Sequence, residues 1–360
     1  MIKFGIVGTG WRSEFFLRIA KACPELFIVS GIVGRTQVKA TEVASRFDVP
    51  VYSSAEDLVE SARPDFVVTS VPRKENPGII KLLASLGMPV LSETPPAESV
   101  EEMEELCSLV RNGARIQVAE QYCLQPHHSA RLTFARSGKI GRITQAQISV
   151  AHGYHGISLI RRFLGIGFEN ATIHTTSFKS PLVKGPGRAG PPEQEKIVQS
   201  EQLIARFDFG DQLGVFDFTG DQYFALIRNP RILVRGERGE ISHDAAVYLK
   251  DFQTPIHLPF RRHTAGEHGN LAGHYLLGIQ AGEDWIYRNP VAPARLFDDE
   301  IAIADCLIRM ASHAAGGESF YSLAEACQDR YLEMAMHQSL GENRPVTTTS
   351  QPWAEYTGCQ

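Results

Sequence analysis

Short apolar runs alternate with longer stretches of helical periodicity in the first third of the chain. The apolar runs lie at residues 3–7, 28–33, 66–69, 89–91 and 116–118, and the helical stretches at residues 13–22, 37–47, 78–86 and 100–111. The runs lack a period-2 alternation of polar residues, which indicates strands that are buried on both faces. Strands that alternate with helices of this length predict βαβ units and a parallel sheet with helices on both sides.

The pattern becomes rich in strands after about residue 122. Helices are expected at residues 128–137, 156–164, 298–314 and 323–340, and strands at residues 143–150, 173–178, 202–209, 212–219, 231–234 and 240–242. Tight turns such as Gly210-Asp211 join successive strands, which predicts an antiparallel sheet. Four phenylalanines alternate along two of these strands, and they are expected either to meet another subunit or to pack on the subunit's own helices. They are Phe207, Phe209, Phe216 and Phe218.

Two segments of the second half are expected to be loops. Residues 184–192 are a run of Gly and Pro that excludes regular structure, and they are interpreted as a flap over a site, an arm onto a neighbouring subunit or a surface loop. The segment from Arg261-Arg262-His263 to His268 and His274 is polar and rich in glycine. It predicts a largely solvated loop, part of which lines a pocket.

Composition and charge argue against several classes of protein. The 36 Lys and Arg residues against 41 Asp and Glu residues give a net charge of −5, which argues against a nucleic-acid or anionic-membrane surface. No apolar run approaches the roughly 18 residues of a membrane-spanning helix. The N-terminal strand lacks the layout of a signal peptide, and the six cysteines have no paired spacing that would predict disulfides or a zinc site. We therefore expect a cytoplasmic protein.

A glycine turn follows the first predicted strand and opens the first predicted helix. It reads Gly8-Thr9-Gly10-Trp11-Arg12-Ser13, which is the context of a dinucleotide-binding turn. The first glycine permits the tight turn, the second lets the backbone approach a pyrophosphate, and the helix N-terminus supplies N–H groups. Ser13 stands where a third glycine or alanine is usual, and its small side chain still permits close packing.

The end of the second predicted strand bears on the choice of cofactor. Gly34-Arg35-Thr36 stands where an Asp or Glu would bind a ribose 2′-hydroxyl. Arg35 and Thr36 suit a 2′-phosphate, which favours NADP, whereas a guanidinium that stacks on adenine would keep NAD acceptable. The prediction is NAD or NADP, with a preference for NADP.

The order of several short motifs resembles the Gfo/Idh/MocA family, which includes glucose–fructose oxidoreductase and inositol dehydrogenase. The motifs are the glycine turn, Ser70-Val71-Pro72, Glu93-Thr94-Pro95, Ser137-Gly138-Lys139-Ile140-Gly141, His155-Gly156-Ile157 and the hairpin at residues 207–210. The resemblance implies a Rossmann domain at residues 1–122 and a C-terminal α/β domain at residues 123–360. The second domain would carry a large, mainly antiparallel open sheet, the substrate site and the oligomer contact.

The resemblance also implies NAD(P)-dependent hydride transfer on a hydroxyl of a sugar, glycoside or polyol. The protein would be a homodimer or homotetramer. From the charge balance, the hydropathy and the spacing of possible ligands, no nucleic acid, membrane or metal is expected as a partner. The cofactor would contact Gly8, Gly10, Trp11, Arg12, Arg35, Thr36, Ser70, Pro72, Glu93 and Gln121.

Three positions depart from the family's pattern. Thr94 replaces the lysine of its Glu-Lys-Pro motif, Ala151 replaces the aspartate of its Asp-x-x-x-His motif, and Asn76 replaces a histidine. His155 is retained, and it is the predicted acid/base because an imidazole gains and loses a proton near neutral pH. A packing role for His155 is the alternative.

Other side chains complete the predicted site. Thr94 and Tyr122 are expected beside His155 as catalytic groups, and His152 and Tyr154 are expected to contact substrate. Tyr122 and Gln121 can also be read as hinge residues. A metal shared by His152, His155 and Glu120 is considered, but the pair of histidines lacks a spaced third ligand and no metal is predicted.

Three functions remain open. The first is a dehydrogenase of a sugar or polyol. The second is a redox-neutral lyase, epimerase or glycoside-cleaving enzyme that uses a retained NAD(P) for transient oxidation, which the altered Thr94 and Ala151 favour. The third is a protein that binds the dinucleotide without redox chemistry.

Overall fold

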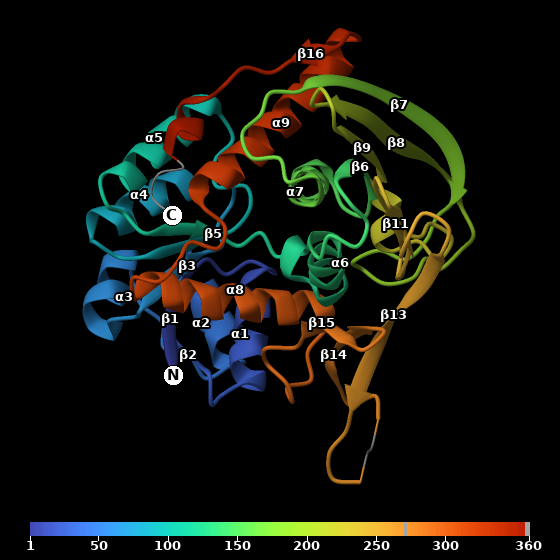
Figure 1. The fold of residues 1–360 in the computed structure, drawn as a ribbon. Helices are drawn as coiled ribbons and strands as arrows, with labels where there is room; N and C mark the ends of the chain where they lie inside the picture. Colours follow the sequence, from blue (N-terminus) through green and yellow to red (C-terminus); the bar gives the residue numbers. More distant parts are fainter. Residues whose placement is uncertain (270–271, 357–360) are drawn as a thin grey trace.

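The computed structural model describes residues 1–269 and 272–356 (Figure 1). It contains two sheets, each with its own layer of helices. The first sheet is parallel and has the strand order β2-β1-β3-β4-β5. Its strands are β1 (Ile2–Val7), β2 (Phe27–Val33), β3 (Phe66–Thr69), β4 (Val90–Ser92) and β5 (Ile116–Val118). The predicted α/β fold with a Rossmann-type sheet is confirmed.

Helices cover both faces of the parallel sheet. On one face α1 (Ser13–Ala22) and α2 (Gln37–Ser45) share a buried apolar cluster with α8 (Asp298–Ala314). On the other face a second cluster includes α3 (Ala55–Ala62), α4 (Asn76–Ser85) and α5 (Val100–Arg111). Adjacent strand residues face opposite clusters, which explains why most strand residues in the middle of the sheet are apolar.

The second sheet has the strand order β15-β14-β13-β12-β11-β10-β6-β9-β8-β7-β16. All its pairings are antiparallel except β6 with β9. Its strands are β6 (Ile143–Ser149), β7 (Thr172–Val183), β8 (Ile197–Asp208), β9 (Leu213–Thr219), β10 (Arg231–Gly236), β11 (Gly239–Ser242), β12 (Ala245–Leu249), β13 (Pro255–Ala265), β14 (Tyr275–Ala281), β15 (Asp284–Arg288) and β16 (Val346–Thr347). The predicted large antiparallel sheet is confirmed.

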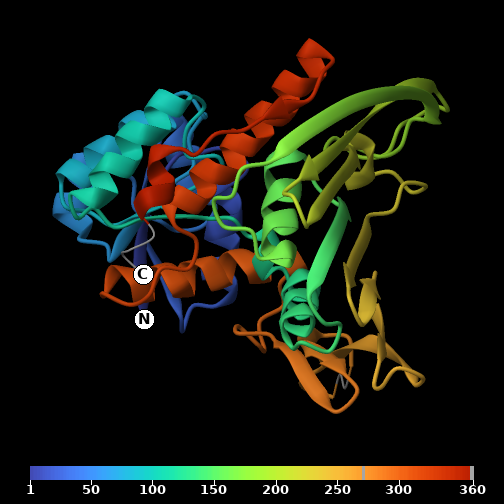
Figure 2. The same cartoon turned by 45° about the horizontal axis from the view of Figure 1, so that its top comes forward.

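Three helices line the side of this sheet that faces the first domain (Figure 2). They are α6 (Pro126–Arg136), α7 (Gly153–Leu164) and α9 (Leu323–Glu342), of which α7 packs on β6 and β9 and α9 packs on β7. Single 3₁₀ turns lie at Tyr122–Leu124, Gly220–Tyr223 and Pro352–Tyr356. Within the described ranges, every helix is too short or too polar to span a bilayer.

The alternating phenylalanines of β8 and β9 pack inside the subunit. Phe207, Phe216 and Phe218 are at most 5% exposed, and the ring of Phe216 lies against Gly156 of α7. Phe209 is partly buried against the same core. Of the two expected placements, the structure therefore shows packing on the subunit's own helices.

Two parts of the sequence prediction need correction. Arg261, Arg262 and His263 lie in β13 and not in a loop, because this strand has mostly exposed residues and lacks an apolar period. Helix α3 and strands β12 to β15 were also missing from the prediction. Only His268 and His274 of the predicted loop lie between strands.

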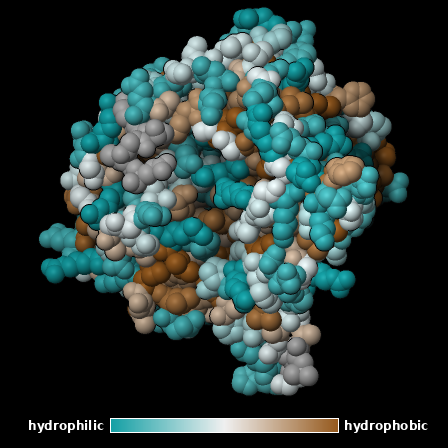
Figure 3. Space-filling model, in the orientation of Figure 1, coloured by the Kyte–Doolittle hydropathy of each residue, from teal (hydrophilic) through white to brown (hydrophobic). Residues whose placement is uncertain are grey.

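The last helices return to the first domain. The side chain of Arg18 in α1 donates to Glu300 of α8 (2.9 Å), and Gln117 of β5 accepts the backbone N–H of Tyr321 just before α9 (3.0 Å). A face hollowed between the two sheets, with many hydrophilic side chains on its rim, is visible in Figure 3. The residues that follow β1, β3 and β4 line the same cavity as the start of α7.

Candidate active site

A cleft of about 850 Å³ lies between the two domains. Its walls come from the glycine turn, the ends of β2, β3 and β4, the 3₁₀ turn at residue 122, the start of α7 and the loop between β7 and β8. The predicted site residues that line it are Gly8, Gly10, Trp11, Arg12, Arg35, Thr36, Ser70, Pro72, Glu93, Thr94, Gln121, Tyr122, His152 and His155. The structure thus brings residues from both domains into one cavity.

The glycine turn has the backbone that a dinucleotide requires. Gly8 has a φ of +130°, and a Cβ there would lie 1.9 Å from the carbonyl oxygen of Ser70, so only glycine fits. A Cβ on Gly10 would meet no atom within 4 Å. This turn therefore leaves open space at the N-terminus of α1, where a pyrophosphate binds in such folds.

Arg12 is held by two carboxylates on the floor of the cleft. Its Nε lies 2.9 Å from Glu93 after β4, and its Nη1 lies 3.1 Å from Asp299 at the start of α8. Burial alone would lower the pKa of Arg12, but these two carboxylates raise it above its usual value. Both carboxylates are consequently held by Arg12 within the chain.

Two cations line the cleft beyond β2, Arg35 in the turn that follows the strand and Lys39 in the first turn of α2. Neither forms an ion pair with any described residue. The Thr36 hydroxyl accepts the backbone N–H of Lys39 (3.4 Å) and so caps α2. Lys39 was not predicted, because a lysine one turn into an exposed helix has no distinguishing sequence signal.

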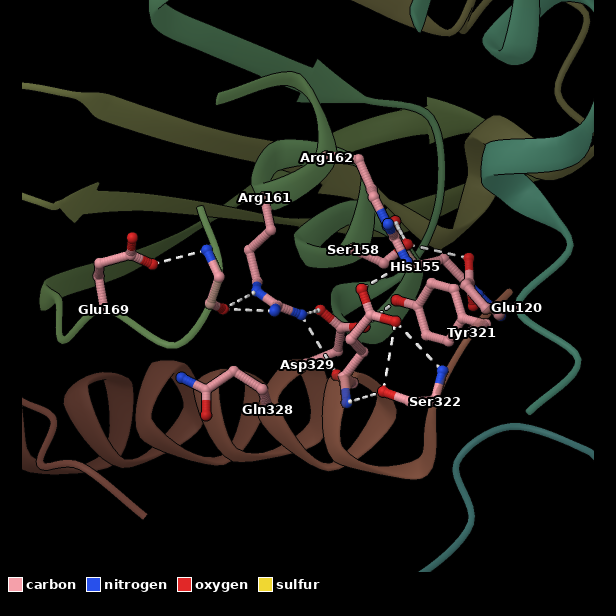
Figure 4. A network of polar contacts seen from close by, with 12 residues as sticks. Glu120, His155, Ser158, Arg161, Arg162, Glu169, Tyr321, Ser322, Gln328 and Asp329 are labelled. Carbon is pink, nitrogen blue, oxygen red and sulfur yellow. Dashed lines mark hydrogen bonds and ion pairs between the residues drawn. The ribbon is translucent and has the colours of Figure 1, made fainter. Parts of the chain in front are cut away.

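His155 is paired with a buried carboxylate. Its Nδ1 lies 2.6 Å from Oε2 of Glu120, and the other oxygen of Glu120 accepts the Ser158 hydroxyl (3.0 Å) (Figure 4). Glu120 is fully buried and His155 is 5% exposed. The pairing leaves Nε2 as the nitrogen that is free for a ligand in the cleft.

A second set of polar contacts fixes the helix that carries His155. Figure 4 shows Arg161 of α7 directed toward Asp329 of α9, which it contacts at 2.6 Å. The hydroxyl of Tyr321 donates to the same carboxylate. Because all three groups are buried, this network anchors α7 against α9 and thereby limits the motion of His155.

Aromatic and imidazole rings surround His155. Tyr122 stacks on it with centroids 4.4 Å apart, and His152 lies edge-on at 4.7 Å. The Nδ1 of His152 is 2.6 Å from the hydroxyl of Tyr223, which also accepts the backbone N–H of His152 (3.0 Å). Burial lowers the pKa of His152 to about 3, with smaller effects of His155 and Arg73, so His152 is neutral at physiological pH.

Burial likewise raises the pKa of both tyrosines in this group, Tyr122 and Tyr223. Their phenols therefore keep their protons over the physiological range, and they serve as neutral hydrogen-bonding groups. Among the described residues there is no group of three His, Cys, Asp or Glu side chains placed to hold a metal ion.

One predicted contact residue lies elsewhere. Tyr154 is 1% exposed and belongs to the apolar cluster of the first domain and α9. Its backbone N–H donates to Glu333 (2.9 Å). Successive residues of a helix point about 100° apart, so the turn that brings His155 to the cleft directs Tyr154 into the core.

Several residues of the cleft were not predicted. The sequence suggests Glu120 only as a third metal ligand, because its pairing with His155 depends on a contact between the end of β5 and α7. Arg188 lies on the loop at residues 184–192, and its guanidinium is 4.3 Å from the ring of Trp11. That loop therefore reaches from the second domain to the glycine turn of the same chain. The other unpredicted lining residues are Val71, Arg73, Gln125, Tyr223, Phe224 and Asp299.

The parallel sheet that carries this turn, and the second sheet that brings a histidine to the same cleft, together give a Rossmann-type sheet joined to a large antiparallel sheet. Residues 2–120 match the model of an oxidoreductase family with an NAD-binding Rossmann fold. The N-terminal third of this chain is thus similar to the Gfo/Idh/MocA family.

Curated relatives match over part of their length. The NADP⁺-dependent scyllo-inositol 2-dehydrogenase IolU of Bacillus subtilis is 29% identical over 129 residues, which are 35% of this chain and 39% of that protein. The uncharacterised oxidoreductase YgjR of Escherichia coli is 23% identical over 146 residues, 40% of this chain and 44% of that protein. The matches thus span about two fifths of these relatives.

Solved structures share the whole fold. Levoglucosan dehydrogenase in its apo form has a TM-score of 0.70 at 17% identity and covers 97% of this chain and 99% of its own. A putative myo-inositol dehydrogenase from Sinorhizobium meliloti has a TM-score of 0.65 at 15% identity, covering 97% of this chain and 100% of its own. At such low identity the likeness is one of fold alone.

Proposed function

We propose that this protein is an NAD(P)-dependent oxidoreductase that acts on a hydroxyl of a sugar, glycoside or polyol. The observation that carries the proposal is the His155–Glu120 pair, which lies in the same cleft as the dinucleotide turn. The inositol dehydrogenase among the curated relatives and the fold shared with levoglucosan dehydrogenase support the substrate class.

The residues of the turn fit the cofactor. Gly8 and Gly10 leave room for a pyrophosphate at the start of α1, and Trp11 lies at the rim with 56% of its surface exposed. Arg35 and Lys39 would contact the ribose 2′ position, where two unpaired cations favour a phosphate and hence NADP. When bound, the nicotinamide supplies the hydride acceptor or donor.

His155 would receive the proton of the substrate hydroxyl at Nε2. The carboxylate of Glu120 fixes the ring through Nδ1 and stabilises the positive charge that the ring acquires. Glu120 thus supplies the carboxylate that the family's motif would place at Ala151, from a different strand of the fold. Thr94 lines the same cleft and offers a neutral hydroxyl where a lysine would offer a charged donor.

The loss of that lysine favours a redox-neutral enzyme as a second candidate. Oxidation of a sugar hydroxyl to a ketone acidifies the neighbouring C–H bond, which permits elimination, epimerisation or glycoside cleavage before the hydride returns. A weaker donor at Thr94 is tolerated in such a cycle, because the hydride only leaves and comes back. A protein that binds the dinucleotide without chemistry has no use for a histidine held by a buried carboxylate.

One set of measurements distinguishes the three functions. The protein is incubated with NAD⁺ or NADP⁺ and a panel of sugars and polyols while absorbance at 340 nm is recorded, and parallel samples in D₂O are analysed by mass spectrometry. Net reduction at ordinary rates of about 1–10³ s⁻¹ supports the dehydrogenase. Deuterium in the sugar without reduced cofactor supports the redox-neutral enzyme. If the protein binds the cofactor but shows neither reduction nor deuterium exchange, both enzymatic functions are refuted.

A further inference from the structure

Two arginines from different domains line the cleft. Arg73 follows Pro72 at the end of β3 in the first domain, and Arg188 lies on the loop between β7 and β8 in the second. Both line the cleft, and both side chains are exposed. Over the described ranges neither is paired with a carboxylate, and the interaction of Arg188 with Trp11 is a cation–π contact.

Their positive charges act on the groups beside His155. The charge of Arg73 is one of the causes that lower the pKa of His152, after burial and His155. The charge of Arg188 acts on Tyr223, the hydrogen-bond partner of His152, whose pKa is mainly raised by burial. The two guanidinium groups therefore approach the same imidazole–phenol pair from opposite domains.

The carboxylates of the cleft are already engaged. Glu93 and Asp299 are held by Arg12, and both oxygens of Glu120 are used by His155 and Ser158. Arg73 and Arg188 consequently have no carboxylate partner among the described residues of the cleft. An arginine side chain offers only hydrogen-bond donors, which suit the oxygens of an anion.

We propose that the substrate is a sugar or polyol that carries an oxyanion, a carboxylate or a phosphate, and that Arg73 and Arg188 bind this group. The claim that this molecule is the substrate rests on the function proposed above, whereas the claim that the cleft binds an anion does not depend on that function. A guanidinium pairs with either oxyanion through two parallel hydrogen bonds, and a bound anion offsets the repulsion between the two cations. Because Arg188 lies on the loop at residues 184–192, binding of the anion also holds this loop over the cleft.

The test compares sugars that differ only at the charged group. Calorimetry on protein saturated with NADP measures the affinity for D-glucose, D-glucuronate and D-glucose 6-phosphate, and for D-galactose and D-galacturonate. We expect at least one acidic sugar to bind about tenfold or more tightly than its neutral counterpart, with a preference that falls at high salt. Comparison of the two uronates with D-glucose 6-phosphate distinguishes a carboxylate substrate from a phosphate substrate.

Three variants assign the preference to residues. Arg73→Gln and Arg188→Gln should each reduce the preference for the acidic sugar about tenfold, the size of a lost charged hydrogen bond. Arg136→Gln is the matched control, since Arg136 is an exposed arginine on α6 outside the cleft, and it should keep the preference. Equal binding of acidic and neutral sugars, absence of binding by every acidic sugar, or a preference unchanged in both variants overturns the proposal.

Two further outcomes distinguish the proposed anion site from cofactor binding and from the proposed reaction. If Arg188→Gln weakens NADP binding and leaves the preference for acidic sugars intact, Arg188 serves the cofactor and the proposal is wrong. If an acidic sugar binds as expected but neither reduces the cofactor nor exchanges deuterium, the anion site stands and the proposed reaction fails.

Discussion

His155 and Glu120 are the residues on which the proposed chemistry depends. His155→Asn keeps the size of the side chain but removes its titration, so turnover should fall by roughly 10²–10⁴-fold. Glu120→Gln should lower turnover less and should change its pH profile, because a neutral amide no longer stabilises the protonated ring. Rates measured from pH 5 to 9 on both variants provide the check.

His243→Asn is the matched control for this experiment. His243 lies outside the cleft and has a φ of +51°, a conformation that asparagine tolerates. The turnover of the His243→Asn variant should equal that of the unmodified protein. A loss below about tenfold in His155→Asn, with an unchanged pH profile, would assign His155 to packing.

Gly10 tests whether the glycine turn binds the cofactor. Gly10→Asp places a charged side chain in open space at the pyrophosphate position, so it should abolish cofactor binding without loss of the folded state. Calorimetric titration with NAD and NADP, together with thermal unfolding, measures both effects. Gly78→Asp is the control, because Gly78 is an exposed glycine of α4 with the same free space and no contact with the cleft. Unchanged affinity in Gly10→Asp would show that the turn does not bind the cofactor.

Arg35 tests the choice between the two cofactors. If its guanidinium binds the 2′-phosphate, Arg35→Ala should weaken NADP by about tenfold or more and leave NAD nearly unchanged, since only NADP carries that charge. The ratio of the two dissociation constants is the informative quantity. Equal losses for both cofactors would instead indicate stacking on adenine.

Single residues of the site were predictable only where a local pattern exposes them. Gly8 and Gly10 follow a strand, and His155 begins a helix after a strand, so their places follow from neighbouring residues. Glu120 and Arg188 give no such signal, because each acts on a partner from a distant segment. The same limitation explains Tyr154, whose direction depends on the rotation of α7 about its own axis.

Elements were predicted best where buried strands alternate with regular helices. The helix bounds 13–22 and 100–111 agree with α1 and α5, and α5 begins with a capping box between Ser99 and Glu102. Strand β13 was missed because most of its residues are exposed, so no apolar period marks it. Its place in the sheet depends on pairing with β12 and β14, which the local sequence does not encode.

The start of α8 should give stability that depends on pH. Asp298 receives two hydrogen bonds from Arg262 of β13 (2.7 and 2.8 Å), and Nδ1 of His127 in α6 lies 3.2 Å away. Burial alone would raise the pKa of Asp298, but these hydrogen bonds hold it below the ordinary value of an aspartate. A lowered pKa contributes stability above the unfolded value of about 3.9, and that stability is lost as pH falls through the folded value.

Asp298→Asn should therefore reduce the free energy of unfolding at pH 7 by about 1 kcal/mol. The difference from the unmodified protein should shrink as pH falls below about 4, where the aspartate of the unfolded chain is protonated. Urea unfolding at pH 7, 5 and 3.5 measures it. Asp284→Asn, which removes an exposed ion pair with Lys139, is the control and should have little effect at any pH. A difference that is constant with pH would contradict the prediction.

At the scale of the whole molecule, the cleft exists because the chain crosses between its two sheets more than once. Helix α8 carries Asp299 back to Arg12 of the first domain, and the loop at residues 184–192 carries Arg188 to Trp11. Both contacts close the cofactor side of the cleft from the second half of the chain. The pattern of strands and helices predicted the two kinds of sheet. The contacts of Asp299 and Arg188 with the first domain depend on tertiary packing, which the local pattern does not show.

The open sheet provides the surface for the proposed homodimer or homotetramer. Since Phe207 and Phe216 point inward, a contact through this sheet would use its opposite face, where Phe178 of β7 is 62% exposed and Ile204 of β8 is 40% exposed. These two residues are diagonal neighbours, because Phe178 pairs with Gln202 and Thr176 with Ile204. Exposed apolar side chains that adjoin on a strand pair are typical of a surface covered in an assembly.

Light scattering on a size-exclusion column should accordingly give a mass that is two or four times the 39.8 kDa of one chain. Phe178→Asp places a charge in the centre of the proposed contact, so it should lower the mass toward that of the monomer at micromolar concentration. Phe252→Asp removes an equally large exposed side chain, 81% exposed between β12 and β13, and should leave the mass unchanged. A mass near 40 kDa for the unmodified protein would contradict the oligomer, whereas equal effects of both variants would place the contact elsewhere. Because the loop that carries Arg188 connects β7 to β8, an assembly through these strands would also limit the motion of the loop over the cleft.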